Sequence, residues 1–176
     1  MLESGPVLGI DPGSRATGWG VITEGSDGTC KILSVGVIRT RTSDDFPARL
    51  RELYAGIVDV IERFSPVECA IEDVFVARNA KSALKLGHAR ASVMMAAMNS
   101  GLRIFEYTPA QIKKAVVGYG GADKGQVQKM VSLILGTNRR FPKDASDALA
   151  VALCHIQTSK FSRFVTVDIR ARGMPQ

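Results

Sequence analysis

Acidic residues stand at a few element ends of this chain, and their positions constrain the fold more than any other feature. Asp11 and Glu72 each close a short apolar run, and Asp144 and Asp147 stand at the beginning of a predicted helix. Carboxylates at strand ends are costly to desolvate unless a cation or hydrogen bonds compensate, and hard cations such as Mg²⁺ prefer oxygen ligands. The four acids therefore predict a metal site.

Apolar and β-branched runs predict five strands. The first three, over residues 6–11, 17–23 and 31–41, are close together in the sequence, which favours an antiparallel meander over helical crossovers. Two further strands are predicted over residues 67–72 and 102–107.

Apolar residues at helical spacing predict the remaining elements. The expected helices cover 44–64 with Ser43 as a cap, 79–99, a short segment from Pro109, a segment from Asp123 to near Gly136 with a capping box to Gln126, and a last one from Pro142 to about Gln157. This order predicts an α/β fold with one mixed five-stranded sheet and helices on both faces. Residues 158–176 carry several basic residues with little helical pattern, so we expect one domain over 1–157 and a mobile basic tail after it.

Composition narrows the functional class. A formal net charge of +6 and a pI near 9.5 favour a polyanionic partner such as nucleic acid, although the same charge also serves solubility. No run approaches the roughly 20 apolar residues of a membrane span, and the start lacks a signal-peptide pattern, so we expect a cytoplasmic protein. The three cysteines form no CxxC pair and are expected to be reduced and mostly buried.

Asp144 and Asp147 lie on one predicted helical stripe with Val151, Cys154 and His155. Acids in a first helical turn commonly just complement the helix dipole, worth about 0.3–1 kcal/mol. That effect does not require both acids on the inward face, which favours a ligand role for the pair. Neither His88 nor His155 has the spacing of a zinc site, and neither is assigned to metal.

The two strand-end acids have simpler alternatives as well. Asp11 shares a strand face with Gly9, which is expected to leave room for a metal or a phosphate backbone, but Asp-Pro-Gly is also a common turn. Glu72 could be a solvated strand end. Asp73, the second choice as a ligand, must point to the opposite face if the strand continues.

The segments around the four acids closely resemble the RuvC-type Holliday junction resolvases of the ribonuclease H-like superfamily. The resemblance covers about residues 6–157 and includes two segments between the acidic motifs, 82–87 and 116–118. It is carried by Gly9-Ile10-Asp11-Pro12-Gly13-Ser14, Thr17-Gly18-Trp19-Gly20, Ile71-Glu72-Asp73-Val74-Phe75, and Asp144-Ala145-Ser146-Asp147-Ala148-Leu149-Ala150. Asp73 departs from the family pattern, in which a neutral residue follows the catalytic glutamate.

The resemblance implies a ribonuclease H-like nuclease domain, a homodimer, and paired metal-dependent cutting of a four-way DNA junction in recombination and repair, leaving 5′-phosphate and 3′-hydroxyl ends. Asp11, Glu72, Asp144 and Asp147 match the family's catalytic, metal-binding acids. Two Mg²⁺ ions per site, with Mn²⁺ as a substitute, would activate a water and stabilise the leaving oxygen. RuvA and RuvB are the implied protein partners.

The same resemblance places a second group of residues near DNA. Lys113 and Lys124 match basic positions of the family, although each alone would be read as a solvated lysine. Phe75 and Arg78 follow Glu72 in a predicted loop, where an exposed aromatic ring can stack on an unpaired base. A core phenylalanine is the alternative for Phe75.

Three other functions remain open at this stage. The first is a structure-selective nuclease acting on RNA, and the second is a basic binding module whose acids are structural. The third is a nucleotide-binding ATPase or sugar kinase, because an Asp-Pro-Gly near a first hairpin resembles their phosphate loops. That third class needs a second large domain, which 176 residues do not easily provide.

Overall fold

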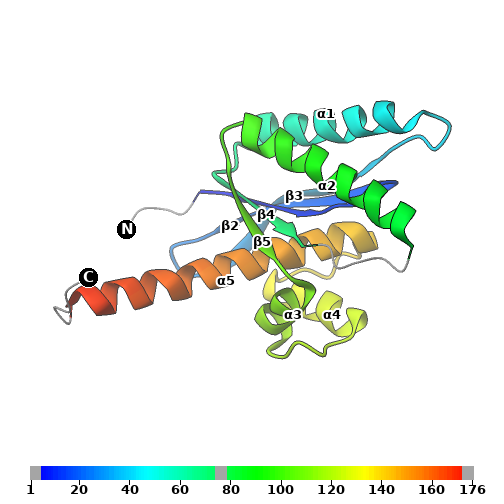
Figure 1. Ribbon diagram of the computed structural model, residues 1–176. Helices are drawn as coiled ribbons and strands as arrows, with labels where there is room; N and C mark the ends of the chain where they lie inside the picture. Colours follow the sequence, from blue (N-terminus) through cyan, green and yellow to red (C-terminus); the bar gives the residue numbers. More distant parts are fainter. Residues whose placement is uncertain (1–4, 74–78, 172–176) are drawn as a thin grey trace.

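The computed structural model describes residues 5–73 and 79–171, with side chains through residue 160, and in this part of the chain one mixed five-stranded sheet has helices on both faces (Figure 1). The strands are β1 (Val7–Asp11), β2 (Ala16–Glu24), β3 (Cys30–Arg39), β4 (Glu68–Glu72) and β5 (Arg103–Tyr107). The helices are α1 (Phe46–Phe64), α2 (Ala80–Asn99), α3 (Pro109–Val117), α4 (Lys124–Ile134) and α5 (Lys143–Ala171). The predicted fold class is confirmed.

The sheet has the order β3-β2-β1-β4-β5. β1, β2 and β3 pair antiparallel, as the short connections predict, while β4 pairs parallel to both β1 and β5. Parallel pairing follows from the chain crossing over through α1 and α2 before each of the last two strands begins. As a result, β1, β4 and β5 all have their carboxyl ends at one edge of the sheet.

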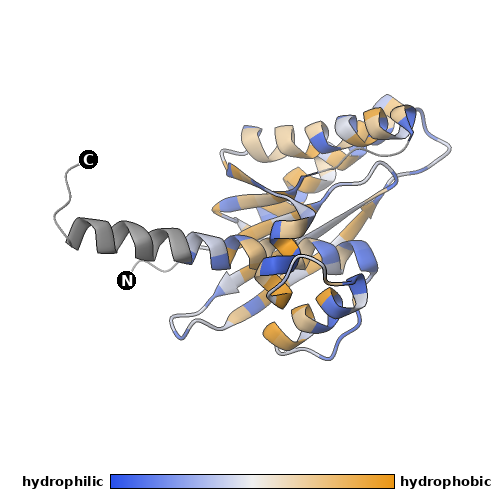
Figure 2. Cartoon of the chain, turned by 60° about the horizontal axis from the view of Figure 1, so that its bottom comes forward, coloured by the Kyte–Doolittle hydropathy of each residue, from blue (hydrophilic) through white to orange (hydrophobic). Residues whose placement is uncertain are grey.

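Two hydrophobic clusters cover the two faces of the sheet. α1 and α2 pack on one face over Leu8, Ile10 and Ile71, whereas α3, α4 and α5 pack on the other face over Ile22 and Ala70. In Figure 2, the strands between these helical layers carry mainly hydrophobic residues, and the connecting loops are more hydrophilic. Strands buried on both faces are expected to read as continuous apolar runs, which is the pattern of β1 and β4 in the sequence.

Close contact between α5 and the sheet depends on glycines in β1 and β2. A Cβ atom at Gly9 would lie 2.2 Å from the carbonyl oxygen of Ala148, and one at Gly18 would lie 1.9 Å from that of Asp144. The space at Gly9, which we expected to admit a metal or phosphate, is therefore filled by the backbone of α5. The prediction that a ligand fills the space beside Gly9 was wrong. A helix that packs flat on the sheet occupies the room that the missing side chain leaves.

Two helix ends differ from the predictions. The cap of α1 is Asp45, whose side chain accepts a hydrogen bond from the Ala48 amide at 2.8 Å, and not Ser43. α5 does not end near Gln157 but continues to Ala171. Residues 158–171 contain neither glycine nor proline, so nothing in the local sequence stops the helix once α5 has begun. The capping box from Asp123 to Gln126 at the start of α4 is confirmed.

The cysteines are reduced, as the sequence predicts. Cys69 and Cys154 are buried, Cys30 is half-buried, and all three are free thiols. Among the helices described, none has the length and apolarity needed to cross a bilayer.

Candidate active site

Asp11 and Glu72 meet because they end neighbouring parallel strands. Ile10 of β1 stands opposite Ile71 of β4, so the next residue of each strand lies at the same sheet edge. Their carboxyl groups lie close enough that, after burial, the charge of Glu72 is the largest cause of the raised pKa of Asp11. The proximity of these two acids is thus a direct consequence of the strand register.

The first turn of α5 brings the other two acids to this edge. Gly18 of β2 pairs with Asp11 and lies directly under the backbone of Asp144, so α5 begins beside the end of β1. Asp144 and Asp147 are half-buried there, and the charges of both raise the pKa of Asp11. Three elements that are distant in the sequence therefore bring four carboxyl groups to one edge of the sheet.

Burial and the charges of neighbouring carboxylates disfavour the ionisation of Asp11, Glu72 and Asp147. Burial, followed by the charge of Glu72, raises the pKa of Asp11 from 3.8 to about 8. Burial also raises the pKa of Glu72 and that of Asp147. A site that holds several carboxyl groups in a partly desolvated space gains from any cation that lets them ionise together.

Lys124 and Lys113, which the family resemblance expects near DNA, lie beside the acids. The Lys124 ammonium lies 3.7 Å from Oδ2 of Asp147, and the charges of Lys124 and Lys113 both act to lower the pKa of Glu72. Lys124 is the first residue of α4 and its side chain is 64% exposed, so it can move toward a ligand without unpacking the core. Both lysines therefore place positive charge beside the acids.

Asp73 points away from the cluster. Its carboxylate lies 3.6 Å from the Arg90 guanidinium on α2, which is on the opposite face of the sheet from α5. Arg90 also contacts Glu106 and donates from Nε to the carbonyl oxygen of Glu72 at 3.4 Å. Sequence reasoning missed Arg90, although an arginine in helical spacing with the buried residues Val93 and Ala97 was a visible signal. Phe75 and Arg78 lie outside the described residues.

The four acids offer the oxygen ligands that a hard divalent cation prefers, but their side chains are spaced too widely to bind one as they stand. Among the residues described, no three His, Cys, Asp or Glu side chains are gathered closely enough to hold a metal ion as they stand. The donor set is nevertheless all oxygen, and the raised pKa values of Asp11, Glu72 and Asp147 are the mark of uncompensated crowding. The chemistry of the four residues therefore fits a divalent metal ion.

The stability of the metal-free protein should depend on Asp11. Its pKa is higher in the folded state than the unfolded value of 3.8, so the folded protein binds the extra proton and loses stability as the pH rises from about 4 to about 8. We expect Asp11→Asn to be more stable than the wild type at pH 8 by about 1–3 kcal/mol and to gain little at pH 5. Thermal unfolding in EDTA at both pH values measures the difference. A gain of equal size at both pH values would contradict the assignment.

Comparison with known proteins places this chain among DNA nucleases. Residues 7–155 match the family model of the crossover junction endodeoxyribonuclease RuvC. The RuvC of Actinobacillus succinogenes is 48% identical over 93% of this chain and 85% of its own length, and that of Photobacterium profundum is 51% identical over 88% of each. The structure of Thermus thermophilus RuvC in complex with Holliday junction substrate superimposes with a TM-score of 0.84 at 34% identity, covering 89% of this chain and 96% of that one.

Proposed function

The chain belongs to the RuvC family of crossover junction endodeoxyribonucleases, and from this we propose that it cuts four-way DNA junctions and that its catalytic acids are Asp11, Glu72, Asp144 and Asp147. The observation that carries the residue assignment is the convergence of these acids from β1, β4 and α5 at one sheet edge, with a pKa of about 8 for Asp11. Resolution of such junctions serves recombination and repair.

Each part of the site has a distinct task in this proposal. When bound, divalent metal supplies an activated water and neutralises charge on the scissile phosphate, and we propose two Mg²⁺ ions, with Mn²⁺ as a substitute. Asp11 and Glu72, on paired strands, present oxygen ligands whose backbone positions are fixed by the sheet register. Asp144 and Asp147 close the site from α5, and the products are a 5′-phosphate and a 3′-hydroxyl.

We assign DNA binding to residues around the acids. Lys113 and Lys124 border the site and would approach the phosphates flanking the cut. Phe75 and Arg78, outside the described residues, stay predicted contacts to the junction centre. The net charge of +6 is consistent with a polyanionic substrate.

We further infer that α2 forms the interface of a homodimer. Leu84, Met95 and Met98 on this helix are 61%, 47% and 55% exposed, and a Cβ at Gly87 would meet nothing within 4 Å. A stripe of exposed apolar residues beside a glycine allows two helices to approach closely. Two-fold symmetry would supply two acid sites for two opposed strands.

Other parts of the proposal rest on family membership. RuvA and RuvB are the proposed partners, and a cytoplasmic location agrees with a DNA substrate. We keep residues 1–157 as the nuclease unit and 158–176 as a basic extension, which begins within α5.

The test is cleavage of a labelled four-way junction, beside a linear duplex and an RNA junction of matched sequence. We expect paired symmetric nicks on the DNA junction only, dependent on Mg²⁺ and absent with Asp11→Asn. Analytical ultracentrifugation of the protein alone should give the mass of a dimer. Tight binding without cutting, across several metals and junction sequences, would instead favour a binding module, and preferential cutting of the RNA junction would favour the RNA nuclease.

A further inference from the structure

A chain of three buried polar side chains crosses from the sheet to α5 behind the acids. Nε2 of His155 lies 2.8 Å from Oε2 of Glu68, and its Nδ1 lies 2.8 Å from the Tyr107 hydroxyl. The exposed fractions of these residues are 1% for His155, 8% for Glu68 and 8% for Tyr107. The imidazole also packs against the Phe105 ring, with centroids 4.4 Å apart. The histidine is therefore held on both nitrogens and on one face of its ring.

The proton positions in this chain follow from the donors and acceptors available. Glu68 as a carboxylate can only accept, so Nε2 of His155 carries a hydrogen and donates it. Burial raises the pKa of Tyr107 to about 12, which keeps the phenol protonated and able to donate to Nδ1. Arg103 contacts the other carboxylate oxygen of Glu68 at the exposed end of the chain. Each of these polar atoms is thus satisfied, the condition under which a buried network rigidifies its surroundings.

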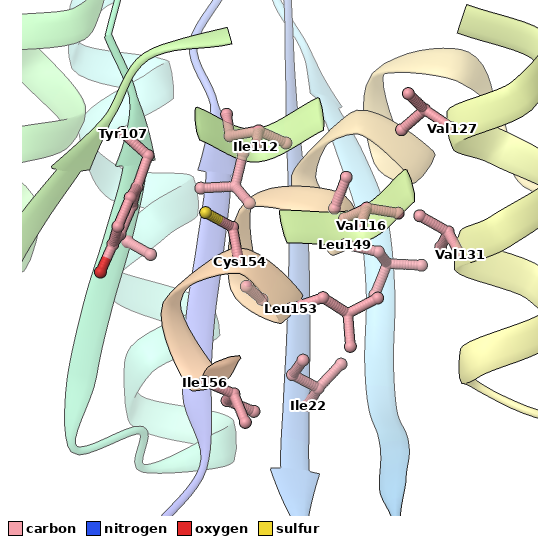
Figure 3. Close-up of a cluster of buried hydrophobic side chains, with 14 of the residues drawn as sticks. Ile22, Tyr107, Ile112, Val116, Val127, Val131, Leu149, Leu153, Cys154 and Ile156 are labelled. Atoms are coloured by element: carbon pink, nitrogen blue, oxygen red, sulfur yellow. The ribbon is translucent and has the colours of Figure 1, made fainter. Parts of the chain in front are cut away.

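Glu68 and His155 belong to elements that carry proposed catalytic acids, and Tyr107 is on the neighbouring strand β5. Glu68 and Glu72 are the first and last residues of β4 and point to the same face, and Tyr107 of β5 is paired with Glu72. His155 follows Asp147 by eight residues in α5, about 12 Å along the helix. Figure 3 shows Tyr107 beside Cys154, with Ile156 on the next part of the same helix.

We propose that Tyr107, His155 and Glu68 are positioning residues for the nuclease reaction, fixing α5 on β4 and β5 so that Asp147 lies at the correct separation from Glu72. This inference rests on the proposed function. The surrounding cluster is apolar, and apolar contacts alone allow a helix to slide or rotate by small amounts because they have no preferred direction. Two hydrogen bonds at opposite ends of one imidazole remove that freedom.

The sharpest test is Tyr107→Phe, which removes one hydroxyl and keeps the ring. Displacement of a reacting group by about 1 Å can cost about 100-fold in rate, so we expect a smaller shift here to lower kcat on the junction about tenfold. We also expect the Mg²⁺ concentration for half-maximal cleavage to rise several-fold, while junction affinity measured in EDTA stays within twofold. Ile156→Val is the matched control, since it alters a buried neighbour of His155 outside the network.

A second set of variants, at His155 and Tyr107 together, tests whether the two residues act as one network. His155→Gln and the double variant with Tyr107→Phe should lose about the same activity, because either change breaks the same chain. Additive losses of cleavage activity would show that the residues contribute only through core packing. The same conclusion would follow if Ile156→Val lost as much activity as Tyr107→Phe at equal thermal stability. An unchanged Mg²⁺ dependence in both Tyr107→Phe and His155→Gln would overturn the inference. If the wild type itself does not cut the junction, the proposed function fails instead.

Discussion

Asp147→Asn is expected to abolish cleavage of a four-way junction while leaving junction binding nearly unchanged. Mutation of a residue that merely supports a metal ligand typically costs 10–100-fold, so loss of a ligand itself should cost at least about 100-fold. Binding depends mainly on contacts to phosphates, and Asn removes a negative charge that repels them. The loss should therefore appear in single-turnover cleavage at saturating protein, with the Kd from gel-shift titration in EDTA unchanged or slightly lower.

Asp73→Asn is the matched control for this substitution. It makes the same change of charge next to Glu72, but its carboxylate faces Arg90 on the other side of the sheet. We expect less than about a threefold effect on cleavage, since the charge acts on the acids only at longer range. Wild-type rates with Asp147→Asn, or equal losses with both variants, would show that the acids of this sheet edge are not metal ligands as assigned.

Much of this architecture could be predicted because it depends on local patterns. Apolar runs closed by Asp11 and Glu72 marked β1 and β4, and the capping box at Asp123 marked the start of α4. The stripe containing Asp144 and Asp147 placed both acids on the buried side of α5. Once the strands are parallel neighbours, the meeting of the acids follows from geometry alone.

The features that escaped prediction depend on contacts between distant parts of the chain. The bond between His155 and Glu68 joins residues 87 positions apart, and although the helical stripe includes His155, nothing in the local sequence indicates its partner. Gly9 was interpreted as space for a ligand because the sequence does not reveal that α5 lies flat on β1. The end predicted at Gln157 assumed that a weak apolar pattern ends a helix, whereas α5 continues to Ala171 through residues that include no helix breaker. The roles of Phe75 and Arg78 stay predictions.

The other large effect is expected from Gly18→Ala, a change that adds one methyl group. At Gly18 a Cβ would lie 1.9 Å from the carbonyl oxygen and 2.3 Å from the carbonyl carbon of Asp144. These are backbone atoms of α5, so the clash cannot be relieved by turning a side chain. Either β2 or the whole start of α5 must move, and overpacking of this kind costs about 1–3 kcal/mol or more. For a chain of this size, that corresponds to a fall in Tm of about 2–12 °C.

Gly18→Ala should damage catalysis beyond its effect on stability, because the displaced backbone carries Asp144 and the displaced strand is paired with Asp11. Gly121→Ala is the control, since its Cβ would come no closer than 4.0 Å to the Tyr119 side chain and its backbone needs no positive φ. Thermal unfolding and junction cleavage, both measured well below the lower Tm, separate the two effects. We expect Gly121→Ala to keep the wild-type Tm and Gly18→Ala to cut the junction at least tenfold more slowly while still folded. Full activity in a destabilised Gly18→Ala would mean that α5 can shift without disturbing the acids. The close approach at Gly18 would then not be required to position Asp144 and Asp11.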